Sequence, residues 1–233
     1  MGMDGGNMSS RINVAIDGPA GAGKSTVARR VAQQLGYVYI DTGAMYRAVA
    51  FAANRAGIPA SDAARLAELM KTIEIALEPG PDGQLVRLNG EDITTGIRSR
   101  EVTLQVSEIA SHEAVRARLV DMQRQLAAMK GIVMDGRDIG TTVLPSAEIK
   151  VFLIASVQVR ALRRFQELSG SEVVPIEQLE KEIADRDRSD ESREISPLTR
   201  AKDAVVVDST ELSIDQVVAV ILDLCRTKTV EAK

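Results

Sequence analysis

A glycine-rich segment that carries a lysine and two hydroxyl side chains is the part of the sequence best suited to chemistry. Residues 18–26 read GPAGAGKST and match the pattern G-x-x-x-x-G-K-[ST]. In such a segment the glycines let successive backbone N–H groups point at one phosphate group, and the N-terminus of a following helix adds partial positive charge. Lys24 supplies a charge for the outer phosphates, and Ser25 supplies a hydroxyl for Mg²⁺, directly or through water. The predicted triphosphate site comprises Gly18, Pro19, Ala20, Gly21, Ala22, Gly23, Lys24, Ser25 and Thr26.

The residues on either side of this segment predict the strand and the helix that hold it. An apolar run covers residues 12–16, and helical spacing extends over residues 23–35. A strand, a loop of this spacing and a helix in succession form the context that distinguishes a phosphate-binding loop (P-loop) from a glycine-rich turn without a ligand. We therefore interpret the segment as a P-loop.

The P-loop alone leaves GTPase switches, ATP-driven machines and small-molecule kinases open. The N-K-x-D motif with which switch GTPases read their base does not occur in the sequence. A large ATPase machine would need a longer chain than 233 residues. These two observations favour a small kinase.

Four groups of charged residues could bind an anionic acceptor next to the triphosphate. They are the segments 41–47 (DTGAMYR), 135–138 (DGRD) and 186–193 (RDRSDESR), and the pair Arg160 and Arg164. Arg47 lies about one turn into the helix that follows a predicted strand, and residues 135–138 follow another strand, at the edge where α/β sheets bind ligands. For Arg160, Arg164 and the charge-rich stretch 177–194, the alternative is a solvent-exposed helix face with weak ion pairs.

Alternating strand and helix patterns predict an α/β layered fold around these groups. Five short apolar runs rich in β-branched residues are typical of buried parallel strands: 12–16, 37–40, 132–134, 149–154 and 204–207. Stretches with helical spacing lie between and after them: 23–35, 45–56, 114–129, 157–168 and 214–225. This order favours right-handed crossovers around one parallel sheet.

One segment departs from that alternation. Apolar residues alternate with polar ones over 73–78 and again over 86–89, and a turn sequence, PGPDG, separates the two runs. Such a pattern predicts a half-exposed antiparallel hairpin. We interpret it as part of a subdomain inserted into the parallel fold.

Composition and charge limit the partners of the chain. The net charge of −4 offers no general basic surface for nucleic acid, and the apolar runs are too short to span a membrane. The first ten residues, MGMDGGNMSS, have neither the basic nor the apolar region of a secretory signal. With a single cysteine, Cys225, these features favour a cytoplasmic protein. We expect Cys225 to pack in the core and His112 to be an exposed helix residue.

Taken together, the motifs resemble those of the bacterial-type cytidylate kinase family of nucleoside monophosphate kinases. The motifs that carry the resemblance occur in order along the chain: the P-loop, DTGAMYR, GEDIT and IRS within residues 90–99, DGRDIGT at 135–141, RDRSDESR, and DST at 208–210. The resemblance implies a three-layer P-loop NTPase fold with a five-stranded parallel sheet, an inserted monophosphate-binding subdomain and a helical lid. It places the kinase domain at 12–228, the insert at about 43–110, the lid at about 156–195, and tails at 1–11 and 229–233.

The resemblance also implies roles for individual residues in transfer of the γ-phosphoryl group from ATP to CMP or dCMP, with Mg²⁺. The acceptor-side residues are Thr42, Arg47, Ser107, Arg116, Arg137, Asp138, Arg186, Asp190 and Arg193. Among them, Ser107, Arg116 and Asp138 would read cytosine, while Arg186 and Asp190 would meet the ribose. On the donor side, Arg160 would lie against adenine and Arg164 near the phosphates. The catalytic set would be Lys24, Arg137, Arg186 and Arg193.

Elementary chemistry is consistent with these roles. A carboxylate can accept a hydrogen bond from the cytosine amino group, whereas uracil presents a repelling carbonyl at the same place. Phosphoryl transfer needs in-line positioning and positive charge and no protein nucleophile. Three positions, Ser25, Thr42 and Ser189, differ from some relatives, and Ser189 stands where some carry another arginine, so we leave it out of the phosphate-binding set.

Two other classes of protein remain as alternatives. One is a small P-loop kinase with a different acceptor, such as another monophosphate or shikimate. The other is a P-loop regulatory or nucleic-acid-binding protein that binds ATP without turnover. The pair Arg116 and Asp138 and the hairpin insert argue against the first, and the net acidity argues against the second. We expect a monomer that binds neither nucleic acid nor membrane.

Replacement of the P-loop lysine tests the phosphate-site assignment. Lys24→Ala removes a positive charge next to the transferring phosphoryl group, so turnover should fall by about 10²-fold or more. The measurement is the steady-state rate of ADP release by a variant whose circular dichroism spectrum matches that of the wild type. Near-normal turnover would contradict the assignment.

Overall fold

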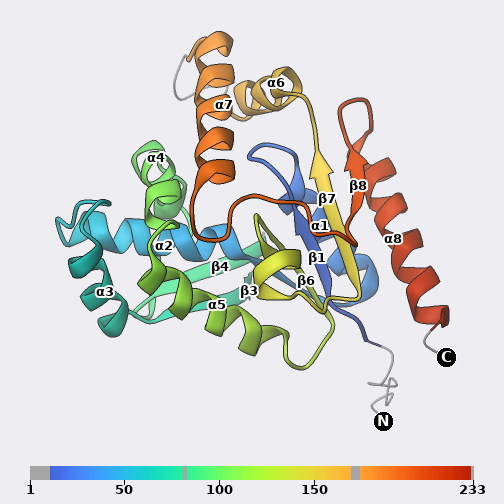
Figure 1. Ribbon diagram of the computed structural model, residues 1–233, viewed down its shortest axis with the longest axis horizontal. Helices are drawn as coiled ribbons and strands as arrows, with labels where there is room; N and C mark the ends of the chain where they lie inside the picture. Colours follow the sequence, from blue (N-terminus) through green and yellow to red (C-terminus); the bar gives the residue numbers. More distant parts are fainter. Residues whose placement is uncertain (1–10, 81–82, 169–173, 232–233) are drawn as a thin grey trace.

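A five-stranded parallel sheet forms the centre of the computed structural model, which describes residues 11–80, 83–168 and 174–231. The strands lie in the order β2-β6-β1-β7-β8, and all neighbours are parallel (Figure 1). They are β1 (Val14–Asp17), β2 (Val38–Asp41), β6 (Ile132–Gly136), β7 (Ile149–Ile154) and β8 (Val205–Asp208). The predicted α/β fold with five parallel strands is confirmed.

Helices cover both faces of the sheet and give the expected three layers. The helices are α1 (Lys24–Leu35), α2 (Thr42–Arg55), α3 (Ala63–Thr72), α4 (Arg100–Ile109), α5 (Glu113–Ala127), α6 (Val157–Leu168), α7 (Ile176–Ser192) and α8 (Ile214–Glu231), with the short turns η2 (Gly96–Arg98) and η3 (Ile139–Val143). Val14 and Ile16 of β1 pack in one core with α1 and α8, whereas Ala15 packs in another with α5 and η3. Both faces of β1 are therefore apolar, as the continuous apolar run predicts.

The register of the strands brings acidic and basic segments to one edge of the sheet. Asp17 at the end of β1 lies beside Gly136 of β6, and Asp41 at the end of β2 lies beside Asp135. The P-loop, α2 and η3 all begin at this carboxyl edge, towards which the arrows of β7 and β8 point in Figure 1. Motifs far apart in the sequence thus meet where α/β sheets bind ligands.

The insert has a hydrophobic core of its own. Its antiparallel sheet consists of β3 (Ile75–Gly80), β4 (Gly83–Leu88) and β5 (Glu91–Asp92), which confirms the predicted hairpin and adds a short third strand. This sheet and helices α2 to α5 share one buried apolar cluster. The side chain of Gln84 connects the insert to the main sheet, because its amide accepts from Asp41 N at 3.0 Å and donates to Tyr39 O at 2.8 Å.

The segment expected as the lid forms helices α6 and α7, which lie beyond the carboxyl edge of the sheet (Figure 1). The two helices pack against each other through Ala161, Leu179 and Ile183. Arg160 of α6 and Asp187 of α7 add an ion pair at 2.7 Å, and both side chains are largely buried. The charge-rich stretch is therefore helical but only partly a solvent-exposed face.

The structure differs from the predicted elements at several places. Helices α3 and α4 were not expected, and α2 begins at Thr42 instead of residue 45 because the Asp41 side chain caps it by accepting from Ala44 N at 2.9 Å. Helix α8 continues six residues past the predicted end at 225, so residues 229–231 of the expected tail are helical. Residues 1–10, 232 and 233 of the expected tails lie outside the described residues.

The single histidine and the single cysteine have different outcomes. The prediction of an exposed helix position for His112 is wrong: the residue is half-buried, precedes α5, and its Nε2 lies 2.6 Å from Ala60 O. Cys225 packs in the core with 1% of its surface exposed, as predicted. Within the described ranges, no helix is both long enough and apolar enough to cross a bilayer.

Candidate active site

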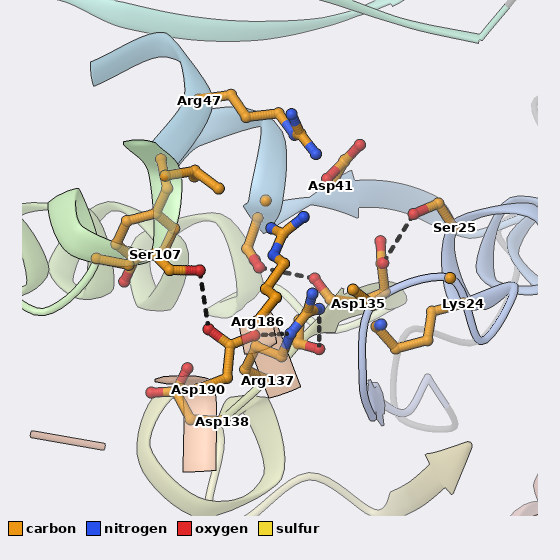
Figure 2. Close-up of a pocket in the computed structure, with 18 of the residues that line it drawn as sticks. Lys24, Ser25, Asp41, Arg47, Ser107, Asp135, Arg137, Asp138, Arg186 and Asp190 are labelled. Atoms are coloured by element: carbon orange, nitrogen blue, oxygen red, sulfur yellow. Dashed lines mark hydrogen bonds and ion pairs between the residues drawn. The ribbon is translucent and has the colours of Figure 1, made fainter. Parts of the chain in front are cut away.

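A cavity of about 200 Å³ lies at the carboxyl edge of the sheet, between the P-loop, the insert and α7 (Figure 2). Four of the predicted triphosphate-site residues line it: Ala20, Gly21, Lys24 and Ser25. All nine residues expected on the acceptor side also line it: Thr42, Arg47, Ser107, Arg116, Arg137, Asp138, Arg186, Asp190 and Arg193. The structure thus brings the two predicted groups together in one space.

The P-loop owes its shape to a close approach between its first glycine and the sheet. Gly18 has φ +148°, and a Cβ atom there would lie 2.0 Å from Leu153 O of β7. No side chain fits at this position, so the loop can leave β1 only through a glycine. Lys24, buried in the first turn of α1, donates from Nζ to Pro19 O at 2.7 Å and so crosses the loop from inside.

Asp135 at the end of β6 is a site residue that the sequence analysis did not assign. Its Oδ2 accepts from Ser25 Oγ at 3.0 Å, and its Oδ1 accepts from Tyr39 OH at 2.9 Å. An acidic residue at the end of an apolar strand was the available signal, but strand order was needed to place β6 beside β1. The arrangement puts a carboxylate next to the P-loop hydroxyl (Figure 2).

Burial shifts the proton equilibria of the two charged groups beside the P-loop. Desolvation and the positive charges of Arg137 and Arg186 together lower the pKa of Lys24 to about 7, against the raising effect of Asp135. Desolvation and the charge of Asp41 raise the pKa of Asp135 to about 7. Lys24 is therefore poorly compensated by the protein, which favours binding of an anion there.

A carboxylate of α7 organises the lower part of the cavity. Asp190 is 4% exposed; its Oδ2 accepts from Arg137 Nε at 2.8 Å and its Oδ1 accepts from Ser107 Oγ at 3.2 Å. Burial alone would raise the pKa of Asp190, but Arg137 and Arg186 outweigh it and the pKa lies below its ordinary value. Asp190 thus joins residues of α4, α7 and the loop after β6 in one charged network.

A second carboxylate pairs with two arginines. Asp138 Oδ2 accepts from Arg116 Nη2, and Asp138 Oδ1 lies 3.7 Å from Arg193 Nη2. The guanidinium of Arg116 also stands over the ring of Tyr46, 5.6 Å from its centroid, and donates to Ala110 O at 3.3 Å. Side chains of all three charged residues are under 10% exposed. The predicted base-reading pair is therefore in direct contact in the absence of substrate.

Two further arginines are less well compensated. Burial and the charges of Arg137 and Arg47 lower the pKa of Arg186 to about 9. Burial, against a raising effect of Asp41, lowers the pKa of Arg47 to about 10. The Nε of Arg186 and the Nη2 of Arg193 are buried without a hydrogen-bond partner among the described residues. Unsatisfied buried donors are costly, so this end of the cavity suits an anion that accepts from them.

The donor-side arginines lie outside the cavity lining. Arg160 is buried, and its guanidinium donates to Ala155 O at 2.9 Å and to Ala20 O of the P-loop at 3.0 Å. Arg164 is partly exposed and pairs with Glu167 at 3.2 Å. Arg163, which the sequence analysis did not assign, donates to Ser209 O at 2.7 Å. The structure thus connects α6 to the P-loop through Arg160.

No group of three or more His, Cys, Asp or Glu side chains that could hold a metal ion on its own occurs in the described part of the chain. The Ser25 hydroxyl and the Asp135 carboxylate are two oxygen groups that lie together beside the P-loop. A divalent ion at this place would need the phosphates of a nucleotide to complete its coordination.

Comparison with known proteins identifies relatives along almost the whole chain. The sequence model of the cytidylate kinase family matches residues 14–227. The chain is 51% identical to the cytidylate kinase of Bacillus velezensis, over 95% of this chain and all of that protein. It is 52% identical to the cytidylate kinase of Geobacillus kaustophilus, over 93% of this chain and 97% of that protein.

A solved structure shares the fold at low sequence identity. An uncharacterized protein from Eubacterium ventriosum superposes with a TM-score of 0.52 and 10% identity, over 93% of this chain and 99% of the other. At this identity the likeness concerns the fold alone.

The depressed pKa of Asp190 predicts how acid affects stability. Such a carboxylate stabilises the folded state above its unfolded pKa of about 3.9, and this contribution disappears as the pH falls through the lower folded value. Asp190→Asn leaves buried arginines uncompensated, so the free energy of unfolding at pH 7 should fall by about 3 kcal/mol. Between about pH 5 and pH 3 the difference from wild type should shrink. Urea denaturation across this range measures it.

A matched control is an aspartate in an exposed ion pair. Asp223 pairs with Arg226 at 2.8 Å, and both side chains are 72% exposed. Asp223→Asn should change the free energy of unfolding by less than about 1 kcal/mol. An Asp190→Asn difference that is as small as this, or that does not change with pH, would contradict the electrostatic account.

Proposed function

The chain belongs to the cytidylate kinase family, and we propose that its cavity is the place where the γ-phosphoryl group of ATP passes to CMP or dCMP. The products are ADP and CDP or dCDP. The observation that carries the assignment of the site is the lining of the cavity, in which the P-loop lysine lies with nine residues expected on the acceptor side. Neither half of the site could bring a donor and an acceptor phosphate together without the other.

The acceptor phosphate binds where the arginines still have N–H donors beyond those that their protein partners accept. Thr42, Arg47, Arg137 and Arg193 are its ligands in this proposal. Support comes from the buried, unpartnered Nη2 of Arg193 and from the lowered pKa of Arg47, both of which a dianionic phosphate would relieve. The charge at this place also holds the attacking phosphate oxygen near the P-loop.

The cytosine base binds at Ser107, Arg116 and Asp138. Arg116 occupies one carboxylate oxygen of Asp138, and the other has only Arg193 at 3.7 Å. That second oxygen can accept from the cytosine amino group, while an arginine donates to an acceptor on the same edge of the base. The pairing of Arg116 with Asp138 orients both side chains toward the place of the base.

The ribose binds at Arg186 and Asp190. Both oxygens of Asp190 already accept hydrogen bonds, from Ser107 and Arg137, and a carboxylate retains further lone pairs for a ribose hydroxyl. The unpartnered Nε of Arg186 is a donor close to the same place. The position of Asp190 between α4 and α7 makes the sugar a contact shared by insert and lid.

The triphosphate of ATP binds along residues 18–26, with Lys24 on its outer phosphates. In this proposal Arg160 lies against adenine and Arg164 near the phosphates, and Arg160 also supports the P-loop through Ala20 O. The transferring group is surrounded by Lys24, Arg137, Arg186 and Arg193 as developing charge is stabilised. No side chain forms a covalent intermediate, because the acceptor phosphate is itself the nucleophile.

Phosphoryl transfer in this family uses ATP with a divalent ion, and we propose Mg²⁺ as that ion. Ser25 and Asp135 would hold it, directly or through water, together with nucleotide phosphates. Their oxygens lie 3.0 Å apart and are of the kind that Mg²⁺ prefers. When bound, the ion neutralises charge on the phosphates.

The remaining proposals concern the chain as a whole. We propose a kinase domain at 12–228, with an insert at about 43–110 and a lid at about 156–195. We further propose a cytoplasmic monomer without nucleic acid or membrane partners, since the net charge of −4 offers no general basic surface for nucleic acid.

Contacts across the cavity support movement of the lid. Helix α7 meets the insert through Arg100 and Glu182, 2.6 Å apart on side chains that are 40% and 34% exposed, and through the bond from Ser107 to Asp190. Exposed ion pairs of this kind contribute about 0–1 kcal/mol, so the contact between Arg100 and Glu182 can open at little cost. Closure over both nucleotides would exclude water and limit wasteful hydrolysis of ATP.

Substitution of Asp138 tests the reading of the base. Asp138→Ala should lower kcat/KM for CMP by about ten- to a hundred-fold and change the value for UMP much less, because uracil never satisfied the carboxylate. Asp138→Asn should improve the relative use of UMP, since an amide can donate to the uracil carbonyl. The measurement is ADP release with CMP, dCMP and UMP. An unchanged ratio of CMP to UMP in both variants would remove Asp138 from base recognition.

Hydrogen exchange tests the lid. Amides of residues 176–192 should exchange more slowly when CMP and a non-transferable ATP analogue bind together than with either alone. Amides of α8, on the far side of the sheet, serve as the internal control and should not change. Equal protection of α7 with and without ligands would rule out closure.

A further inference from the structure

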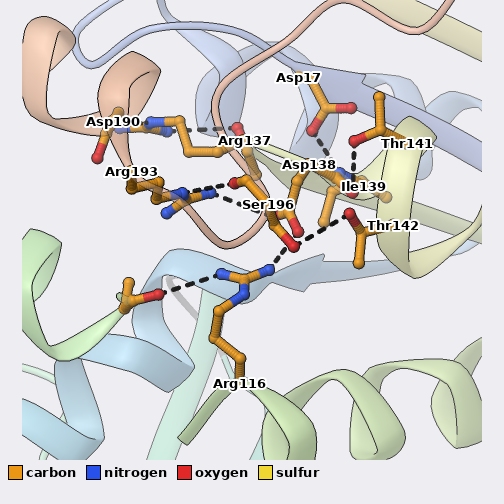
Figure 3. Close-up of polar contacts among 12 residues, drawn as sticks. Asp17, Arg116, Arg137, Asp138, Ile139, Thr141, Thr142, Asp190, Arg193 and Ser196 are labelled. Carbon is orange, nitrogen blue, oxygen red and sulfur yellow. Dashed lines mark hydrogen bonds and ion pairs between the residues drawn. The ribbon is translucent and has the colours of Figure 1, made fainter. Parts of the chain in front are cut away.

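The carboxylate of Asp17 has two partners, and both belong to the loop that carries Asp138. Asp17 is the last residue of β1 and is 4% exposed. Its Oδ1 accepts from Ile139 N at 2.8 Å (Figure 3). Its Oδ2 accepts from Gly140 N at 2.7 Å. The two bonds connect the strand that leads into the P-loop with the turn η3.

The turn η3 is a single π-helical turn, and contacts with other segments hold it at both of its ends. Arg124 of α5 donates to Thr142 O at 2.7 Å and to Val143 O at 3.2 Å at its far end. The Thr142 hydroxyl contacts Ser196 Oγ at 3.2 Å, in the segment that follows α7. Asp17 supplies the support at the beginning of the turn, directly after Asp138.

The hydrogen bonds to Asp17 hold the backbone directly after Asp138, whereas the side chain of Asp138 has ion pairs of its own. The side chain of Asp138 is paired with Arg116 and Arg193, and both of these line the cavity and change partners if substrate enters. The bonds to Asp17 involve no group that would contact a substrate. They are therefore the contacts that can keep Asp138 in place while its own ion pairs rearrange.

Burial of a carboxylate at this position has a desolvation cost, which the hydrogen bonds from the two amides partly offset. Burial raises the pKa of Asp17 to about 6, while the bonds from Gly140 and Ile139 act in the opposite direction. An apolar residue at the end of β1 would avoid the desolvation, but it would leave two buried N–H groups without partners. The two amides and the carboxylate form a unit that an amide side chain can satisfy only in half.

We propose that Asp17 is a positioning residue for the acceptor: by holding the amides of Ile139 and Gly140 it places Asp138 for recognition of cytosine. The proposal rests on the base-reading role proposed above for Asp138. Since Asp17 also directly precedes Gly18, it ties the loop that binds the donor to the loop that reads the acceptor. A change at Asp17 should therefore first reduce the preference for CMP over UMP.

The test is Asp17→Asn. Asparagine has nearly the same volume but presents one acceptor and one donor, so one of the two amides faces an N–H group. We expect KM for CMP to rise about tenfold, and the ratio of kcat/KM for CMP to that for UMP to fall about tenfold. KM for ATP should change by less than about twofold, because the P-loop contacts remain.

The matched control lies at the other end of the same strand. Asn13 is also 4% exposed; its Nδ2 donates to Ala127 O at 3.0 Å and its Oδ1 accepts from Ile132 N at 3.3 Å. Asn13→Ala removes two buried hydrogen bonds next to β1 but none near η3. Its Tm should fall while the ratio of CMP to UMP stays at the wild-type value.

A second variant disturbs the same contact from the other side. A Cβ atom on Gly140 would lie 3.3 Å from Asp17 Oδ2 and 3.1 Å from Lys150 Cδ. Gly140→Ala leaves the carboxylate in place but crowds it, so it should reduce the ratio of CMP to UMP in the same direction. This variant keeps the test available if Asp17→Asn does not fold.

The outcomes separate this inference from the proposal beneath it. If both variants lower Tm but leave the ratio of CMP to UMP unchanged, while Asp138→Ala changes it, Asp17 has a structural role only and the inference is overturned. If KM for ATP rises as much as KM for CMP, Asp17 serves the P-loop instead and the inference is again overturned. If Asp138→Ala itself leaves the ratio unchanged, the base-reading proposal fails first.

Discussion

Positive charge that the protein does not fully neutralise is the condition on which the site depends. Lys24, Arg47, Arg137, Arg186 and Arg193 line one cavity, and burial with mutual repulsion lowers the pKa of Lys24 to about 7 and of Arg186 to about 9. Nucleotide phosphates relieve this repulsion on binding. The repulsion among the cationic side chains falls most when the donor and acceptor phosphates meet at the centre of the cluster, because negative charge then develops around the transferring phosphoryl group. Substrate affinity and catalysis therefore both depend on this excess of positive charge.

Three carboxylates hold this cluster of positive side chains in position without neutralising all of its charge. Each of them contacts a different partner: Asp135 contacts Ser25, Asp138 contacts Arg116, and Asp190 contacts Arg137. They come from the end of β6, the loop beyond it and the last turn of α7. The proposed closing of insert and lid around a nucleotide would thus start from arginines that these carboxylates already orient, even where individual ion pairs exchange partners. This preorganisation lowers the entropic cost of binding.

Features encoded by local spacing could be predicted from the sequence, whereas features that depend on strand order could not. The P-loop and the five parallel strands follow from periodicity and glycine positions within a few residues, but the expected burial is wrong for the edge strands β2 and β8, which expose Val38, Val205 and Val206. Helices α3 and α4, each ten residues long, were missed although Asp62 and Ser99 supply N-caps and the buried apolar residues of both helices have helical spacing. Asp135 and Asp17 could not be assigned, because their roles need β6 beside β1. The buried pair of Arg160 with Asp187 likewise requires α6 packed on α7.

Strand order also explains why donor and acceptor do not compete for one place. With β1 at the centre, β2 and β6 lie on one side and β7 and β8 on the other. Loops after β2 and β6 carry Thr42 and Asp138 to the acceptor side of the P-loop. Segments after β7 and β8 bring Arg163 and Ser209 to its opposite side, where they contact Ala22 O. In the proposed function, a phosphoryl group held by the central loop would face the acceptor on the side of β2 and β6 and the donor on the other side, as in-line transfer requires.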